Sequence, residues 1–202
     1  MSLVLSSVYA GNLVYYSLIA NSNKIILDVY ENFNKQSFRN RCVIASPNGP
    51  LKLIIPIVRS SKNIVKDVKI DNTQNWKKIH WKSLGSSYRS SPYFEFYEDE
   101  FYSLYFKNKN DFLFDFNNKI NLAILKCLGI ETEIIISSSY VEKDLEIEDF
   151  RNIIPSKSKD LEKFKEIKYN QVFQEKQSFL PNLSILDLLF NEGPLAKQFL
   201  AH

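Results

Sequence analysis

The order of apolar and polar positions divides the chain into a strand-rich first part and a helical second part. Apolar runs of strand length, separated by short polar stretches, occupy residues 3–9, 24–30, 37–45, 51–58 and 65–70. A short helix that begins near Asn12 is predicted between the first two runs. The Asn-Gly pair within Ser46-Pro-Asn-Gly-Pro50 predicts a β-hairpin between the third and fourth runs, and the proline that follows predicts a loop longer than two residues.

From residue 71 onward the apolar spacing becomes that of helices. Three helices are predicted: from the N-cap candidates at 71–73 to the Ser-Ser-Pro at 90–92, from the acidic turn near residue 95 to about 107, and over 111–128. Gly129 is the expected stop of the third helix. A strand over residues 131–137 follows, and a short helix capped by Ser184 is predicted near the end of the chain.

These elements together predict an α/β (α+β) fold in a single domain of residues 1–202. Residues 1–70 are expected to be mainly sheet with a hairpin, and residues 71–130 mainly helical. Residues 142–168 carry closely spaced charges of both signs, which is typical of a mobile or solvated excursion.

The composition excludes several classes of protein. The chain has 202 residues, of which 45% are hydrophobic and 24% charged, as in globular proteins. Its 26 basic against 23 acidic residues give too small an excess for a dedicated nucleic-acid binder, so nucleic acid is not an expected partner, although Trp76-Lys-Lys and Trp81-Lys keep this class as a third option.

The N-terminal stretch and the cysteines bear on the compartment. The uncharged stretch before Lys24 lacks both the basic start of a signal peptide and the continuous apolar run of a membrane span. Cys42 and Cys127 belong to no CxxC pattern, which fits a reducing compartment. We therefore expect a cytoplasmic protein without membrane insertion.

The segment Phe38-Arg-Asn-Arg41 is a candidate anion site. If the segment is extended, Arg39 and Arg41 project to one face with Asn40 between them, and two guanidinium groups suit a phosphate or a carboxylate. The alternative is a solvated strand face with ordinary ion pairs.

The first predicted helix contains a second candidate. Lys77 and Lys78 lie in its first turn, where positive charge opposes the helix dipole unless an anionic ligand binds the open N–H groups there. His80 and the terminal His202 are the only histidines, so any general acid or base role of a histidine is assigned to His80. The alternative is a packed histidine bonded to a backbone carbonyl. A Cys42–His80 dyad is less favoured, because Cys42 is expected to be a small core residue of a strand.

The segment around Ser184 contains a third candidate. Ser184 and Asp187 have the S-x-x-D form of a capping box, which explains both as structural residues. Asn182 is not explained by the cap, and its amide is a candidate to face a cleft. No histidine or cysteine spacing predicts a metal site, no glycine-rich phosphate loop is found, and the cofactor is unknown.

Four separated motifs are found along the chain: Phe38-Arg-Asn-Arg41, Asp71-Asn-x-x-Asn-Trp-Lys-Lys-x-His80, Tyr88-x-x-x-Pro-Tyr-Phe94, and Pro181-Asn-Leu-Ser-Ile-Leu-Asp-Leu-Leu189 with Asn191-x-Gly-Pro194. In this order and spacing they resemble the WbqC-like protein family over nearly the whole chain, in the shorter branch common in Bacteroidetes-type bacteria. The family takes its name from a protein of bacterial O-antigen and surface-polysaccharide gene clusters. The resemblance therefore implies a role in that pathway without naming a reaction.

The chain departs from the family pattern in two places. Many members begin with Gln-Pro-x-Tyr-x-Pro, where this chain has Ser6-Ser-Val-Tyr-Ala-Gly11 and keeps only Tyr9. The acidic pair that usually follows the second strand falls near residues 29 and 30, with Asp28 and Glu31 merely adjacent. The positions that match the family are Lys35, Asn40, Arg41, Trp76, His80, Asn182, Ser184 and Asp187.

The leading hypothesis is a cytosolic, transferase-like enzyme that acts on a small anionic, activated intermediate of bacterial surface-polysaccharide biosynthesis, such as a nucleotide sugar or an acyl donor. His80 is the expected general acid or base. The expected anion- or substrate-binding residues are Lys35, Arg39, Asn40, Arg41, Lys77, Lys78, Asn182 and Asp187. The alternative is a non-catalytic binding or assembly module of the same pathway. We also predict that His80, Arg41, Asn40 and Asn182 converge on one cleft.

Overall fold

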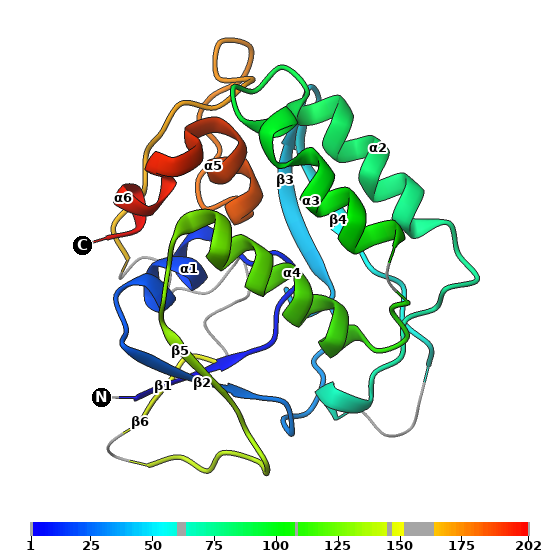
Figure 1. Cartoon of the computed structure of the whole chain (residues 1–202), viewed down its shortest axis with the longest axis vertical. Coiled ribbons are helices and arrows are strands. Elements are labelled where there is room, and N and C mark those ends of the chain that lie inside the picture. Colours follow the sequence, from blue (N-terminus) through cyan, green and yellow to red (C-terminus); the bar gives the residue numbers. More distant parts are fainter. Residues whose placement is uncertain (1, 60–63, 108, 145–146, 152–163, 202) are drawn as a thin grey trace.

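One end of the molecule is built on a four-stranded parallel sheet (Figure 1). The computed structural model describes residues 2–59, 64–107, 109–144, 147–151 and 164–201. The sheet contains β1 (Ser2–Ser6), β2 (Lys24–Asp28), β5 (Glu133–Ile136) and β6 (Ile147–Asp149). Their order across the sheet is β5-β2-β1-β6, so β1 lies between the strand that follows it in the chain and the last strand.

Both faces of β1 are covered, because Leu3, Val4 and Leu5 are all buried, which is typical of a strand inside a parallel sheet. In β2, Ile25 and Leu27 are buried, while Ile26 on the other face is half-buried. The crossover between β1 and β2 is helix α1 (Leu13–Ala20). The side chain of Asn12 accepts a hydrogen bond from the N–H of Tyr15, so the start of this helix is confirmed as predicted.

The predicted hairpin consists of β3 (Arg41–Ser46) and β4 (Gly49–Ile54). Its loop has two residues, so the expectation of a longer loop was wrong. Gly49, with φ of 104°, permits the tight turn. Pro50 lies opposite Ala45, whose own N–H donates to a tyrosine hydroxyl instead of to β4, so the missing N–H of the proline costs no ladder bond.

The strand predicted over residues 65–70 was also wrong. Its first residues form a 3-10 turn, η1 (Val65–Asp67), and only single bridges follow at Lys69 and Ile70. Val65 and Val68 are both buried, and their spacing of three is that of a helical turn instead of a strand. A short apolar run is therefore ambiguous until its neighbours are known.

The helical part follows the prediction closely. Its helices are α2 (Trp76–Tyr88), α3 (Phe94–Phe106), α4 (Leu113–Leu128), α5 (Ile185–Glu192) and α6 (Ala196–Leu200). Helix α2 begins later than expected, because Asp71 accepts bonds from Thr73 and Gln74 and so forms a turn ahead of the helix. Helix α4 ends at Gly129 in the left-handed conformation, as predicted.

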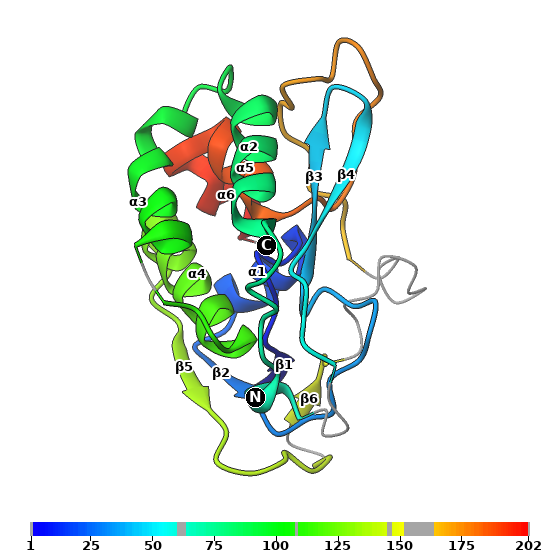
Figure 2. The same ribbon diagram turned by 90° about the vertical axis from the view of Figure 1, so that its right-hand side faces the viewer.

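The hairpin stands between the helices and the C-terminal segment around residues 164–180 (Figure 2). Helices α2 and α5 pack on β3 from one side.

Strand β6 lies inside the charged stretch 142–168 and pairs with β1, so part of that stretch belongs to the sheet. Residues 145–146 and 152–163 of the same stretch lie outside the described residues. The result is a mixed α/β fold with a mostly strand N-terminal half and a helical C-terminal half.

Candidate functional site

The carboxyl ends of the parallel strands carry a buried polar cluster. In parallel sheets, ligands bind outside these ends, at the point where the strand order reverses. Here the order reverses at β1, which has β2 on one side and β6 on the other. The strands end at Ser6, Asp28 and Asp149, so polar side chains of three strands meet at this edge.

Arg39 is neutralised inside this cluster. Its Nε donates to Oε1 of Glu31 at 2.9 Å, and its Nη2 donates to Oε2 of the same carboxylate. The Nη2 group also lies 2.8 Å from Oγ of Ser6, at the end of β1. Arg39 is 2% exposed, so this guanidinium serves as the partner of a buried carboxylate, and binding of an external anion by it stays a prediction.

Arg151 forms the second half of the cluster. Its guanidinium donates to Asp28, which is fully buried at the end of β2, and to both oxygens of Asp149, at 2.9 and 2.7 Å. Hydrogen bonds from Arg151 hold the pKa of Asp149 below its usual value. The guanidinium lies 4.7 Å from the ring centre of Tyr140, a cation–π contact. The backbone carbonyl of Arg151 accepts hydrogen bonds from the Ser6 hydroxyl and the Arg39 guanidinium, and these bonds join the two halves of the cluster.

The sequence analysis missed this cluster, because Asp28 and Glu31 stood beside the expected acidic pair and Arg151 belonged to no motif. The available signal was position: Asp28 directly follows an apolar run predicted as a buried strand. Carboxyl ends of parallel strands meet at one edge, so acids placed there are candidates for one site.

His80 belongs to a separate, neutral group of buried side chains. Its Nε2 lies 3.1 Å from the carbonyl of Ile54, so Nε2 carries the proton. Nδ1 therefore accepts from the hydroxyl of Tyr9 at 3.0 Å, and Tyr105 donates to the Tyr9 oxygen. Burial lowers the pKa of His80 to about 4, so the ring is neutral near pH 7.

This geometry matches the packed-histidine alternative. His80 is 2% exposed, both of its ring nitrogens are hydrogen-bonded, and the ring of Trp76 packs edge-on against it at 5.3 Å. Cys42 is buried in β3, as expected, and burial raises the pKa of its thiol. Because the partners of His80 are Tyr9 and Ile54, the Cys42–His80 dyad is not formed. A catalytic role of His80 stays a prediction.

Only half of the predicted capping box forms, because Ser184 caps the helix but Asp187 does not bond back to it. Ser184 caps α5 as predicted, since its Oγ accepts from the N–H of Leu186. The N–H of Ser184, however, donates to the carbonyl of Val43 instead of to Asp187. The carboxylate of Asp187 turns into the core and accepts two hydrogen bonds, from the hydroxyl groups of Tyr88 and Tyr169, each at 2.6 Å. Burial raises the pKa of this carboxyl group despite those two bonds.

Asn40 and Arg41 of the first motif, and Lys35 in the loop before it, differ in burial. Asn40 is buried and donates from Nδ2 to the carbonyl of Ile55 at 2.9 Å. Arg41 is half-buried at the first position of β3, and Lys35 is exposed in the loop before it. Each of these three residues therefore has different surroundings.

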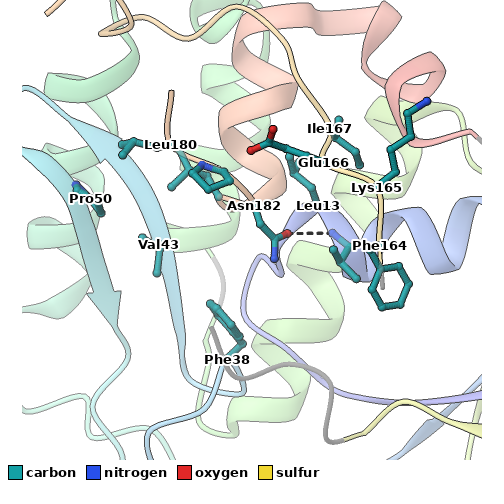
Figure 3. A pocket seen from close by; sticks show the side chains of 13 residues that line it. Leu13, Phe38, Val43, Pro50, Phe164, Lys165, Glu166, Ile167, Leu180 and Asn182 are labelled. Carbon is teal, nitrogen blue, oxygen red and sulfur yellow. Dashed lines mark hydrogen bonds between the residues drawn. The ribbon is translucent and has the colours of Figure 1, made fainter. Parts of the chain in front are cut away.

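Asn182 borders an apolar hollow of about 400 Å³ between the hairpin, the start of α1 and the C-terminal segment (Figure 3). Its walls include Leu13, Phe38, Val43 and Phe164. The Oδ1 atom of Asn182 accepts from the N–H of Val14 at 3.1 Å. The residue thus caps a helix distant in sequence, a role that sequence spacing could not reveal.

Lys77 and Lys78 border a second hollow, of about 460 Å³, at the start of α2. Lys109 also lines this hollow and pairs with Asp111 at 2.9 Å. Asn75, the N-cap residue, makes no side-chain cap, and within the described part of the chain the N–H groups of residues 76–78 have no hydrogen-bond partner. Burial lowers the pKa of Lys77, and Asp111 partly offsets this.

Three of the four residues predicted to share a cleft lie around the end of β4. His80 and Asn40 bond to the adjacent carbonyls of Ile54 and Ile55, and Arg41 pairs with Ile54 in the hairpin. Asn182 lines the first hollow, which none of these three residues lines, so convergence of all four on one cleft stays a prediction.

The residues that the structure describes contain no group of three histidine, cysteine or acidic side chains placed to hold a metal ion. None of the helices in this part of the chain is both long enough and apolar enough to cross a membrane.

The protein is a mixed α/β protein. It has a parallel sheet with charged side chains at its carboxyl edge, a separate hairpin and a helical half. The chain belongs to the WbqC-like protein family, which it matches over residues 7–156. It is similar to the uncharacterized protein Rv1507c of Mycobacterium tuberculosis, with 26% identity over 213 residues that cover 93% of this chain and 92% of the relative. No solved structure matches.

Proposed function

We propose that this WbqC-like protein binds a small anionic, activated intermediate of bacterial surface-polysaccharide assembly in the cytosol, and that the hollow at the start of α2 receives the anionic group. The pathway follows from the gene clusters that give the family its name. A nucleotide sugar and an acyl donor attached to phosphate both present the required charge.

One observation carries the choice of site: three lysines, Lys77, Lys78 and Lys109, line a hollow at the start of α2, where the N–H groups of the first helical turn have no partner among the described residues. Lysines in a first turn oppose the helix dipole, and an anion would remove that conflict. Among the described residues of the wall, Asp111 is the acidic one, and it pairs with Lys109, whereas Lys77 and Lys78 form no ion pair in that part of the chain. Nδ2 of Asn72 and Nε2 of Gln74 each donate one hydrogen bond within the protein, which leaves each amide a second N–H for a sugar or ribose.

Binding without catalysis is the version that the geometry favours. The expected acid or base, His80, is neutral, buried and separated from the hollow by Trp76. A transferase is the second candidate, and one observation favours it: the hydrogen-bonded series Tyr105–Tyr9–His80 ends directly behind that tryptophan. Movement of Trp76 on ligand binding would bring His80 to the hollow.

A thermal-shift screen of nucleotide sugars, acyl phosphates and polyphosphate tests the proposed ligand. We expect a saturable rise in Tm with the true ligand and its loss in the Lys77→Glu/Lys78→Glu variant. The variant without ligand should be slightly more stable than the wild type, because carboxylates suit a helix N-terminus. Lys52→Glu/Lys82→Glu is the matched control: it changes the net charge equally, at exposed residues outside the hollow.

Equal ligand shifts in the wild type and the Lys77/Lys78 variant would reject this site. Catalysis is tested with His80→Gln, whose amide keeps a donor for Ile54 and an acceptor for Tyr9 but cannot transfer a proton as imidazole does. A transferase would lose turnover of the identified ligand in this variant while its binding is kept. A binding protein would show no turnover in either form.

A further inference from the structure

The apolar hollow beside Asn182 is a separate feature that the anionic ligand does not use. It lies on the opposite face of the hairpin from α2, between β3, the start of α1 and residues 164–167 and 180–183 (Figures 2 and 3). Its volume of about 400 Å³ falls within the range of roughly 300–1,000 Å³ typical of small-molecule sites. This hollow therefore needs its own explanation.

The floor of the hollow is part of the hydrophobic core, and its rim is half-exposed. Leu13, Phe38 and Leu183 are buried at the floor, whereas Val43 and Phe164 on the rim are only partly covered. Such a wall favours aliphatic groups, because contact with them removes apolar surface from water.

Asn182 supplies one directed polar group. Because its Oδ1 accepts from Val14, the other amide atom is fixed as the Nδ2 donor. Figure 3 shows this nitrogen pointing into the space between Val43, Phe38 and Phe164. No partner for Nδ2 is found among the described residues. Asn182 also has φ of 52°, a conformation that few residues other than glycine adopt and that asparagine tolerates.

The surroundings argue against a negatively charged ligand. The first three N–H groups of α1 are all taken, by Leu183, Asn182 and Asn12, so this helix offers no donor to an anion. In Figure 3 the ammonium group of Lys165 extends away from Asn182, and the carboxylate of Glu166 stands on the same wall.

We propose that this hollow is a second binding site, for a neutral aliphatic ligand whose single carbonyl-type oxygen accepts a hydrogen bond from Nδ2 of Asn182. Ketones, esters and amides of medium-length acyl chains have this chemistry. The site is independent of the anion site at α2 and does not rest on the proposed function.

Titration with 2-heptanone, followed by the methyl NMR signals of leucine and valine at pH 8, tests the proposal. We expect saturable shifts at Leu13, Val43 and Leu183. Asn182→Asp keeps the acceptor for Val14 and tolerates the backbone conformation but replaces the Nδ2 donor by a carboxylate oxygen. It should weaken binding by about fivefold or more, the effect of one lost hydrogen bond.

Two further variants complete the experiment. Val43→Trp should abolish binding without loss of Tm, because the larger side chain fills the hollow from its rim. Asn48→Asp, the same chemical change in the exposed hairpin turn, should bind like the wild type. Absence of saturable shifts in the wild type, or equal binding by Asn182→Asp, would overturn the proposal. Neither result depends on the Lys77/Lys78 variant, so the two proposed sites succeed or fail separately.

Discussion

The hydroxyl of Tyr9 lies 3.0 Å from Nδ1 of His80, although 71 positions separate the two residues in the sequence. Tyr9 is the single residue kept from the N-terminal Gln-Pro-x-Tyr-x-Pro pattern, and His80 ends the second motif. Their contact joins the loop after β1 to helix α2. Retention of the tyrosine therefore has a structural reason, whether or not the site performs chemistry.

Tyr9→Phe should destabilise the protein. The change leaves Nδ1 of His80 and the hydroxyl of Tyr105 without their shared partner in a buried environment. An unpaired buried polar group costs about 1–3 kcal/mol, which urea unfolding followed by circular dichroism would resolve. His80→Ala should cost about 2 kcal/mol or more, through both the cavity and the lost bonds. Losses below about 0.5 kcal/mol in both variants would contradict this account of the core.

The stability of the protein should depend on pH through His80. Its pKa is lowered by burial from 6.5 to about 4, so between these values the unfolded chain binds the proton and the folded chain does not. The free energy of unfolding should therefore fall as pH falls from 6.5 to 4, by at most about 1.4 kcal/mol per pH unit, and should be unaffected by this group above 6.5.

His80→Gln isolates that contribution from the titration of carboxylates. The glutamine amide stays neutral over the whole range, so the unfolding free energy of the wild type minus that of the variant should be constant above pH 6.5 and should fall as pH falls from 6.5 to 4. A constant difference from pH 7 to pH 4 would show that His80 is protonated equally in both states and would refute the neutral assignment.

The elements of this fold could be predicted where a local signal decides them. Asn12, Gly129 and the Asn-Gly turn each act through bonds or dihedral angles within a few residues, and all three mark the element that was expected. The run at 65–70 failed because its conformation is set by partners elsewhere: the N–H groups of Val65 and Lys66 donate to carbonyls of the loop after β2.

The site was harder to predict because its contacts are made at long range. Asp187 matched a capping box locally, yet its partners Tyr88 and Tyr169 come from other segments. Arg39 was assigned to an external anion because nothing nearby in the sequence indicated that the chain would fold Glu31 against it. A carboxylate within the fold and one from a ligand present the same chemistry to arginine, and only the fold distinguishes them.

Glu31→Gln should be strongly destabilising, because it leaves the Arg39 guanidinium buried without a countercharge. Breaking a buried pair by removal of one partner costs about 3–5 kcal/mol. Glu98→Gln is the matched control: it removes the carboxylate from the exposed pair with Arg89 and should cost less than about 1 kcal/mol. Urea unfolding of both variants provides the comparison. Equal losses in the free energy of unfolding would contradict the prediction that the buried pair contributes more to stability than the exposed pair.

Asn117 and Asn121 occupy successive turns on the buried side of α4. Oδ1 of Asn117 has no partner among the described residues, but its Nδ2 does, and this difference from Asn121 leads to different predictions. Nδ2 of Asn117 donates to the carbonyl of Arg39 at 2.8 Å, which ties α4 to the charged cluster. Both amide atoms of Asn121 are buried without a hydrogen-bond partner among the described residues. Leucine has the branched shape of asparagine without its polar atoms but is larger, so each replacement combines the loss of the polar group with the same increase in side-chain volume.

Asn117→Leu should therefore lose about 1–3 kcal/mol, because the carbonyl of Arg39 is left unpaired in the core. Asn121→Leu should lose less than Asn117→Leu, by about 1 kcal/mol or more, because it removes polar atoms whose burial is uncompensated and leaves no partner unpaired. Thermal and urea unfolding of the two single variants, side by side, measure the contrast. A loss in Asn121→Leu equal to or greater than that in Asn117→Leu would refute the unpaired assignment, since both replacements enlarge the side chain by the same amount and differ in the hydrogen bond that is lost.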